Sequence, residues 1–419
     1  MTTLAEHAAE PTPQPAQGVR TSVDAYLNRL RGGDVGSVPA VAGLVALILV
    51  FTILRPHTFT NSFNFANLID QGAAVIVIAM GLVFVLLLGE IDLSAGFSAG
   101  ACGAVMGIVL TNHHQPWWLS ILAGLALGAV IGASIGVLVA RLGIPSFVVT
   151  LAAFLGLQGV LLVLIGEGGT IPVRDKLILK VMNGNLPTWL GWALFAVCVG
   201  GYALISLQRM NSRRASGLSN EAGAVLAVKV AALAVLLGAA TAYLSGERSR
   251  NPQITSIHGV PDVVPLLIVL LVGLTFVLTR TPFGRHVYAV GGNAEAARRA
   301  GINVARVRLS CFIICSTLAA VAGVLFASRD NSISPSTGGS TTLLLAVGAA
   351  VIGGTSLFGG KGRVVDAILG GLVVAVIQNG MGLLNKTSGV IYIVTGIVLL
   401  VAASVDALSR RRAAATGRV

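Results

Sequence analysis

Twelve long apolar segments recur along the chain and limit its fold more than any other feature. An apolar helix crosses the hydrocarbon core of a membrane with about 20 residues. Segments of this kind cover residues 38–55, 70–89, 95–112, 117–140, 146–166, 187–207, 223–246, 262–279, 309–328, 341–358, 366–384 and 388–405. The pattern predicts an all-α fold, a polytopic transmembrane helical bundle of about 12 spans, within a range of about 10 to 14.

The composition fits the same class of protein. Of the 419 residues, 55% are hydrophobic and 11% are charged, whereas a soluble globular domain carries about 25% charged residues. Three regions follow: a polar tail at 1–37 that is expected to be disordered, a transmembrane domain at 38–408 with a polar loop at 280–308, and a basic tail at 409–419. The first region lacks the basic start and the cleavable apolar core of a signal peptide.

Lys and Arg are distributed unevenly between the two sides of the predicted bundle. With alternating loops, 19 of them lie on the side of the N-terminus and 8 on the other, while Lys229 lies within a span. Loops with the excess of Lys and Arg face the cytoplasm. Both termini and the loop 280–308 are therefore predicted to be cytoplasmic. The net charge of +12 is explained by this topology, and no nucleic-acid partner is predicted.

One polar segment, residues 291–307 with the sequence GGNAEAARRAGINVARV, has the marks of a short capped helix. Asn293 is a preferred N-cap, and Gly301 stands where a left-handed residue ends a helix. An acid in the first turn, Glu295, and bases in the last turn, Arg298 and Arg299, suit the helix dipole. Between them, Ala296 and Ala297 favour a helix. The segment predicts about two turns of helix, preceded by a glycine-flanked turn at 283–285.

This helix has no apolar stripe with which to fold back onto the bundle, and two interpretations remain open. It is either a solvated connector whose arginines enforce the topology, or a docking element shaped for a groove on a separate cytoplasmic protein. The residues alone do not separate the two.

Polar residues interrupt the apolar segments at three places. The interruptions are Glu90, Asp92 and Ser94; Gly353, Gly354, Thr355 and Ser356; and Gln378 and Asn379. A carboxylate at mid-membrane costs about 2.5–3.5 kcal/mol on insertion scales, so it is a functional candidate by default. The alternatives are a hydrated turn for the carboxylates and helix–helix hydrogen bonds for the amides. The first two breaks share the pattern G-xxx-L-xx-G, which hints at an internal duplication.

Residues that support catalysis or metal binding do not gather in the sequence. Cys102, Cys198, Cys311 and Cys315 lie in apolar runs and are interpreted as packing residues. The six histidines are scattered outside the spans. The segment 354–362 fails as a P-loop, because Thr355 replaces a required glycine and Gly362 replaces the Ser or Thr after the lysine. No catalytic residue, metal site or cofactor is predicted, and an integral membrane enzyme is disfavoured.

Four stretches together resemble one known family. Residues 281–304, TPFGRHVYAVGGNAEAARRAGINV, resemble the cytoplasmic loop of the permeases of bacterial ABC importers for pentoses and related sugars. The residues EIDLS at 90–94, with Gly96, resemble the GxIDLSxG motif of that family. The residues PSFVVTL at 145–151 and IGGTSLFGG at 352–360 resemble its PSFIVTL and IGGTSLxGG stretches. The long middle of the chain, with an extra span at 223–246, is most similar to the D-xylose branch.

The resemblance implies a function, a set of partners and roles for named residues. It implies a permease in the bacterial inner membrane that pairs with a second copy among membrane lipids and imports a monosaccharide, D-xylose before other pentoses. A separate ATPase subunit would dock on a coupling helix, and a periplasmic sugar-binding protein would dock on outer loops such as 167–186 and 329–340. Coupling residues would be Gly284, Arg285, Gly292, Asn293, Glu295, Ala296, Ala297, Arg298, Arg299 and Gly301. The residues at the three polar breaks would serve the path or its gating.

Two other functions stay open from the sequence. A sister ABC permease for branched-chain amino acids or nucleosides would share the fold, because selectivity would reside largely in the binding protein. An ion-coupled secondary transporter would use Glu90 and Asp92 as coupling groups and would need no ATPase. That second alternative leaves the capped helix in the loop 280–308 unexplained.

Overall fold

The computed structural model describes residues 36–216, 223–249 and 251–415. Its longer helices are α2 (Val38–Leu54), α4 (Ser62–Leu87), α5 (Ala95–Gly107), α6 (Trp117–Ala140), α7 (Ser146–Ile165), α9 (Thr188–Ala215), α10 (Gly223–Ser245), α11 (Val263–Arg280), α14 (Val304–Asp330), α15 (Ser340–Gly353), α16 (Val364–Leu383) and α17 (Ser388–Ala415). Every apolar segment assigned from the sequence corresponds to one of these helices, so the prediction of an all-α bundle is confirmed.

Length and composition divide these helices into two groups. Within the described ranges, eight helices are long and apolar enough to cross a membrane, namely α4, α6, α7, α9, α10, α11, α14 and α16. Shorter apolar helices lie at Val38–Leu54, Ala95–Thr111, Ser340–Gly353 and Ser388–Val401. A polytopic helical membrane protein follows from this. The number of spans and the side of the membrane that holds each terminus stay predictions.

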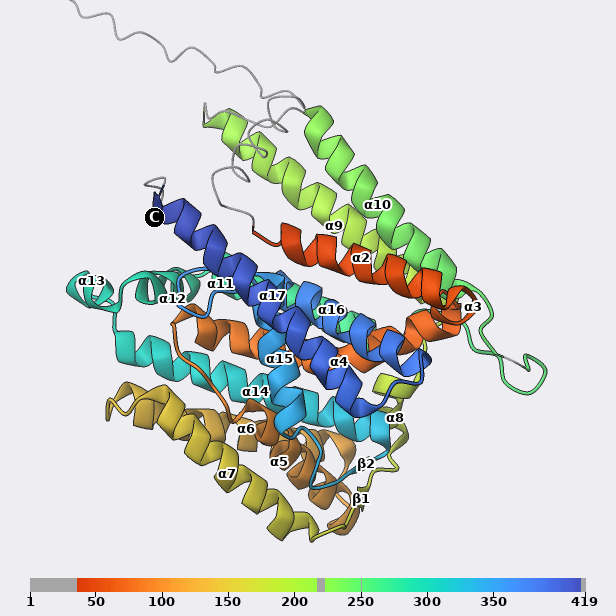
Figure 1. Cartoon of the computed structure of the whole chain (residues 1–419), viewed down its shortest axis with the longest axis horizontal. Coiled ribbons are helices and arrows are strands. Elements are labelled where there is room, and N and C mark those ends of the chain that lie inside the picture. Colours follow the sequence, from red (N-terminus) through yellow and green to blue (C-terminus); the bar gives the residue numbers. More distant parts are fainter. Residues whose placement is uncertain (1–35, 217–222, 250, 416–419) are drawn as a thin grey trace, which may run out of the picture.

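The bundle is built around α4 and α14, which lie beside each other in the centre of Figure 1. In the apolar window of α4, 83% of the residues are buried, against 6% in α9 and in α10. Helix α14 packs on α5 and α6, and α4 packs on α15 and α16, whereas α9 and α10 pack mainly on each other. A surface as apolar as that of α9 and α10 is stable against lipid.

Glycines bring α6 unusually close to α14. A Cβ atom built on Gly128 would lie 2.7 Å from the carbonyl oxygen of Ser316, and one on Gly132 would lie 2.5 Å from that of Phe312. A Cβ on Gly136 would lie 2.9 Å from the Cα of Leu309. The spacing of four residues therefore forms one stripe along α6, and small residues at this spacing let two helices approach closely.

At one end of the bundle, two loops that are distant in sequence join into what we call the strand cap. Strand β1 (Ile171–Pro172) pairs antiparallel with β2 (Ser332–Ile333), with Ile171 opposite Ile333. The short helix α8 (Lys176–Asn183) follows β1 and packs on the end of α14. The strand cap consists of β1, α8 and β2, and it lies at the opposite end of α14 from α12 and α13 (Figure 1).

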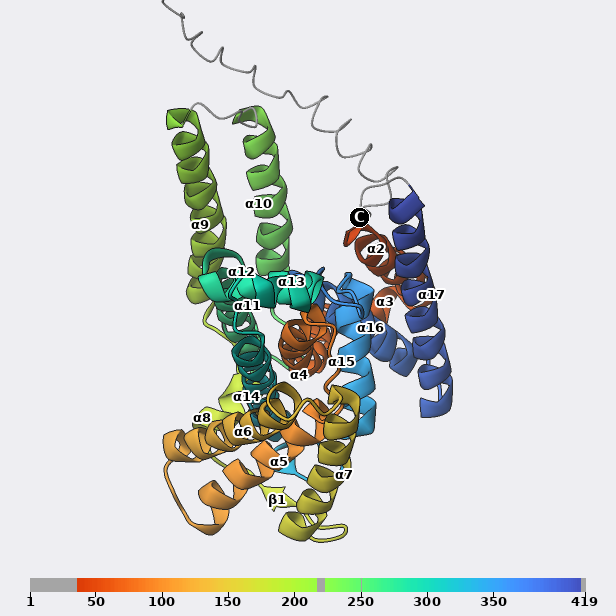
Figure 2. The same cartoon turned by 90° about the vertical axis from the view of Figure 1, so that its left-hand side faces the viewer.

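Helices α9 and α10 form a hairpin that extends away from the bundle (Figure 2). Its attachment lies near the end of α10, where the hydroxyl of Tyr243 donates a hydrogen bond to the carbonyl of Thr60. The ring of Tyr243 also lies edge-on to that of Phe65, with centroids 5.9 Å apart. The extra span predicted at 223–246 is thus a peripheral helix.

Three expectations from the sequence need correction or qualification. The turn predicted at 283–285 is wrong, because these residues lie within the helix α12 (Pro282–Gly292). Residues 409–415, expected in the C-terminal tail, continue α17. The disordered tail predicted at 1–37 falls almost entirely outside the described residues.

Candidate functional site: the coupling loop

The loop at 280–308, here called the coupling loop, contains two short helices in place of one. The first is α12, which begins where the hydroxyl of Thr281 accepts a hydrogen bond from the N–H of Gly284 at 3.2 Å, with Pro282 at the first helical position. A Cβ on Gly284 would lie 2.1 Å from the carbonyl oxygen of Leu278. Glycine is needed there because α11 and α12 meet main chain to main chain. Arg285 and Gly292 lie exposed on α12.

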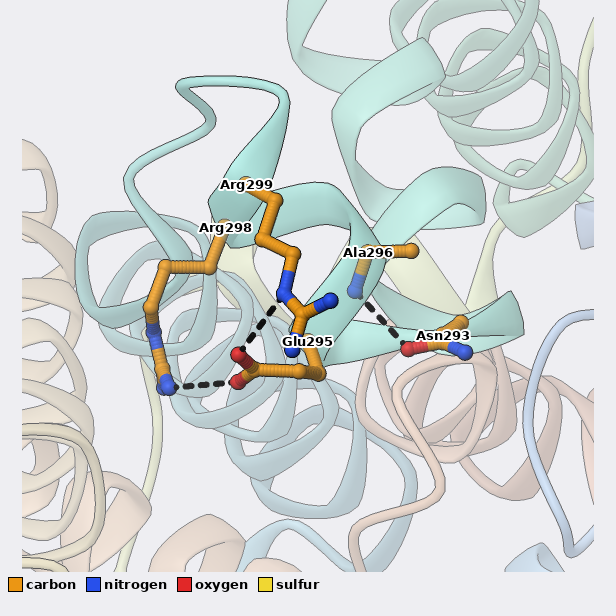
Figure 3. Close-up of polar contacts among 5 residues, drawn as sticks. All are labelled: Asn293, Glu295, Ala296, Arg298 and Arg299. Atoms are coloured by element: carbon orange, nitrogen blue, oxygen red, sulfur yellow. Dashed lines mark hydrogen bonds and ion pairs between the residues drawn. The ribbon is translucent and has the colours of Figure 1, made fainter.

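The second is α13 (Ala294–Arg299), and its caps are those that the sequence predicts. The side-chain oxygen of Asn293 accepts from the N–H of Ala296 at 2.9 Å (Figure 3). At the other end Gly301 is left-handed, with φ of 84°. The N–H of Gly301 bonds the carbonyl of Arg298, and the N–H of Ile302 bonds that of Ala297, both at 3.0 Å. This pair of bonds is a Schellman motif, which stops the helix sharply.

The charges of α13 face solvent and pair within the helix. The Glu295 carboxylate lies 3.0 Å from the Arg298 guanidinium and 3.3 Å from that of Arg299 (Figure 3). Such exposed pairs add little stability. Ala297 is the one residue of α13 that is buried, at 5% exposure, and it belongs to the main apolar core. The helix is therefore held by small side chains, the buried Ala297 and the partly buried Ala294, and presents its charged residues outward.

An open cavity of about 430 Å³ lies beside α13. Its lining comes from α12, from the turn after α13 and from the start of α14, and includes Phe283, His286, Ile302, Asn303, Arg306 and Ser310. A lining that combines apolar side chains with the guanidinium of Arg306 suits a side chain that combines an apolar body with an acid.

Among the predicted path residues, Glu90 finds a partner that the sequence does not reveal. Its carboxylate lies 3.1 Å from the Nε of Arg308, the last residue of the coupling loop, which lies in the first turns of α14. Both side chains are largely buried. The two residues are too distant in sequence for any local pattern to pair them.

Asp92 and Ser94 form a separate, local contact. Both are fully buried, and one carboxylate oxygen of Asp92 accepts from the N–H of Ser94 at 2.9 Å and from its hydroxyl at 2.6 Å. Beside them, the hydroxyl of Thr150 on α7 donates to the carbonyl of Ile91 at 3.1 Å. The contacts order the link between α4 and α5.

The break after α15 is also held by local bonds. Gly353 ends α15 and Gly354 is left-handed, with φ of 119°. Thr355 and Ser356 are buried, and the hydroxyl of Ser356 accepts from the N–H of Phe358 at 3.1 Å. The two breaks with the G-xxx-L-xx-G pattern meet in space, because the N–H of Gly360 donates to the carbonyl of Leu87 at 2.8 Å. Their backbones differ, however: Gly96 lies in α5, whereas Gly360 is left-handed in a loop.

The amides of α16 lie far from these breaks. Asn379 and Asn64 on α4 exchange two hydrogen bonds of 2.9 Å, and Asn379 also donates to Gln71 at 3.4 Å. Gln378 is half-buried beside them. Asn64 and Leu87 are separated by about 35 Å of helix at 1.5 Å per residue. The structure thus gathers the predicted path residues at the two ends of α4, and does not place them around one cavity.

These features define a polytopic helical membrane protein that presents a shaped polar loop at one end. Comparison with known proteins gives the family. The family model described as branched-chain amino acid transport system / permease component matches residues 64–403, and the chain belongs to this family. It is therefore a multi-pass protein of the bacterial cell membrane.

The curated relatives cover nearly the whole chain. The xylose transport system permease protein XylH of Escherichia coli strain K12 is 36% identical over 89% of this chain and 92% of its own length. The Haemophilus influenzae protein of the same name is 33% identical over 88% of this chain and 95% of its own length. The ribose import permease protein RbsC of Escherichia coli strain K12 is 30% identical over 88% and 92%. No solved structure matches.

Proposed function

We propose that the chain is the transmembrane permease subunit of an ATP-binding-cassette importer, which moves a monosaccharide inward by alternating access. ATP would be hydrolysed by a separate cytoplasmic subunit that docks on the coupling loop. The observation that carries the proposal is α13, a helix capped at both ends by Asn293 and Gly301, exposed on its charged face, and held to the bundle through Ala297. A mere connector needs neither cap.

The docking surface extends beyond α13 itself. The cavity beside it offers a recess between α12 and the start of α14, with His286 and Arg306 at its rim. A partner that receives α13 in a groove could place an acidic side chain in this recess. The contact would then interlock, which resists sliding better than a single inserted helix.

The strand cap supports a second docking surface on the opposite face. The outer loops 167–186 and 329–340, expected to receive a periplasmic sugar-binding protein, meet as one unit through β1 and β2. The side-chain amide of Asn183 donates to the carbonyl of Ser328 at 2.7 Å and to Asn331 at 3.3 Å. A preformed surface of this kind binds with a smaller entropic cost than two independent loops.

The transported sugar is proposed from the relatives. Permeases named for xylose and ribose are similar to this chain over about nine-tenths of its length, and D-xylose is the first substrate to test. Two copies would pair around a central path among membrane lipids. In each copy the polar residues at both ends of α4 would contribute to gating, with Glu90, Asp92, Ser94 and residues 353–356 at one end and Gln378 and Asn379 at the other.

Co-purification from native membranes tests the docking role. Exchanging the charges, with Glu295→Arg and Arg299→Glu together, keeps one opposite-charge pair at i, i+4, so α13 stays formed. The exchange reverses the charges offered to a partner, and we expect the recovery of a P-loop ATPase to fall at least tenfold. Arg141→Glu, an exposed charge change after α6, is the matched control and should leave recovery unchanged.

Two outcomes would overturn the proposal. One is full ATPase recovery with the exchanged charges. The other is ion-driven uptake by vesicles that contain this chain alone, which would establish the secondary transporter with Glu90 and Asp92 as coupling groups. Competition of labelled xylose uptake by ribose, arabinose, a branched-chain amino acid and a nucleoside then identifies the substrate class.

A further inference from the structure

Gly291, near the end of α12, lies where three parts of the main chain meet. A Cβ built on it would lie 1.8 Å from the carbonyl oxygen of Leu87 and 2.9 Å from the amide nitrogen of Gly360. The N–H of Gly360 also donates to that same carbonyl of Leu87, at 2.8 Å. The end of α4, the end of α12 and the loop after α15 therefore touch with no side chain between them.

Two more glycines complete this contact. Gly359 is left-handed, with φ of 85°, and a Cβ on it would lie 2.9 Å from both the carbonyl oxygen of Gly291 and the amide nitrogen of Gly89. Gly89 is itself left-handed, with φ of 73°, and faces the carbonyl of Phe358. We call Leu87, Gly89, Gly291, Gly359 and Gly360 the glycine junction.

Further bonds tie both arms of the coupling loop to the same place. On the arm before α13, the hydroxyl of Tyr288 donates to the carbonyl of Gly362 at 2.8 Å. On the arm after α13, Arg308 pairs with Glu90, three residues beyond Leu87. The helix α13 thus lies between α12 and α14 in the chain, and each of these two helices contacts the end of α4.

A contact of this kind transmits displacement efficiently. Side chains can change rotamer and absorb a small shift, whereas close-packed main chain has no such freedom and low compressibility. A movement of α12 towards Leu87 that exceeds a few tenths of an ångström must displace Leu87 and Gly360. Leu87 ends α4, the most buried candidate span, and Gly360 follows α15.

We propose that the glycine junction is a rigid joint that carries movement of α13 to the ends of α4 and α15, with Gly291 as its positioning residue. The proposal rests on the proposed function, since it needs an ATPase that moves α13. It adds a route by which the polar breaks after α4 and after α15 move together when α13 moves. Both breaks contact α12, and they also contact each other.

A glycine on the preceding helix α11 provides a matched control. Gly291→Ala forces the joint apart, whereas Gly273→Ala places its methyl group where nothing lies within 4 Å. In vesicles that contain the complete importer, we expect Gly291→Ala to retain the ATPase but to lower sugar uptake per ATP hydrolysed at least tenfold, and Gly273→Ala to stay within twofold of the native protein. Equal uptake by the two variants overturns the proposal. If no ATPase is recovered with the native protein, the proposed function is wrong, and this outcome is distinct from a failure of the rigid joint.

A cross-link tests rigidity independently, even where Gly291→Ala is not recovered from the membrane. A Cβ on Gly360 would lie 3.4 Å from the Cα of Gly292, so a short bis-methanethiosulfonate reagent can join cysteines at these two positions even though their Cβ atoms do not face each other. In the double variant Gly292→Cys with Gly360→Cys, we expect cross-linking to leave uptake within twofold of the untreated form, because a rigid joint loses nothing when it is tied. Uptake that is lost on cross-linking and restored by a reductant overturns the proposal. Sugar uptake by each single-cysteine variant measures the effect of the substitution without a cross-link.

Discussion

The two ends of α14 are held in opposite ways. At Val304 the helix follows α13, which is exposed, charged and anchored by Ala297. At Asp330 it enters the strand cap, where the buried hydroxyl of Ser328 donates to the carbonyl of Ile178 at 2.7 Å and accepts from the N–H of Met182 at 3.1 Å. The helix α13 at the first end packs on the core only through small alanine side chains, whereas the strand cap at the other end is held by several buried hydrogen bonds.

The difference separates a part that is free to move from a part that is fixed. Displacing α13 exposes little apolar surface and breaks no buried hydrogen bond of its side chains, so the cost is small. Displacing the strand cap would leave buried polar groups without partners, which costs about 1–3 kcal/mol for each group. A helix of about 40 Å, which 27 residues give at 1.5 Å each, joins the two.

The largest effect is expected where the movable end is anchored. Ala297→Asp places an unpaired charge in the apolar core, which costs several kcal/mol, so α13 should detach. Trypsin should then cleave after Arg298 and Arg299 at least tenfold faster in the purified protein. Ala296→Asp adds the same charge at an exposed position of the same helix, and it should leave cleavage within twofold of native. Equal cleavage in both variants would mean that Ala297 is no anchor.

A smaller effect is expected from the fixed end. Ser328→Ala removes the hydroxyl that serves two backbone groups of α8, and it should lower the free energy of unfolding by about 1–3 kcal/mol. Thermal unfolding in detergent measures this loss. Ser332→Ala removes a hydroxyl that bonds the nearby carbonyl of Asp330, and its midpoint should match the native one. If Ser328→Ala unfolds at the same midpoint temperature as the native protein, the strand cap is not the more firmly held end of α14.

The smallest effect concerns Glu247, in the segment between α10 and α11. The hydroxyl of Ser256 and the backbone N–H groups of Ile257, Ser249 and Arg248 donate to its carboxylate and lower its pKa from 4.5 to about 2. Because the pKa is lower in the folded chain, these bonds stabilise the segment above pH 4.5 and are lost as the pH falls towards 2. Amide exchange at Ile257, corrected for intrinsic rates, should accelerate over that interval. In Glu247→Gln that dependence should disappear; if it persists, another group is responsible.

Features of the fold that depend on neighbouring residues could be predicted from the sequence. The apolar runs mark the helices because about 20 consecutive apolar residues have few alternatives to a buried or lipid-facing helix. The caps of α13 are equally local, since Asn293 and Gly301 act on backbone groups a few residues away.

What the sequence did not reveal depends on distant contacts. Residues 283–285 of α12 were expected as a turn around Gly284, and glycine disfavours helices in isolation. Gly284 and Gly291 are required by backbone from α11 and α4, which local propensity cannot express. The pairing of Glu90 with Arg308 is of the same kind, since it joins residues brought together only by the packing of α4 on α14.

The glycine stripe of α6 restricts which substitutions the contact between α6 and α14 can accept during evolution. The atoms that a new methyl group would meet at Gly128 and Gly132 include the carbonyl oxygens of Ser316 and Phe312, and every amino acid has that oxygen in common. No exchange of a single side chain on α14 can therefore make room by shrinking a neighbour. A lineage that acquires a larger residue at either position has to separate the two helices or restore the glycine.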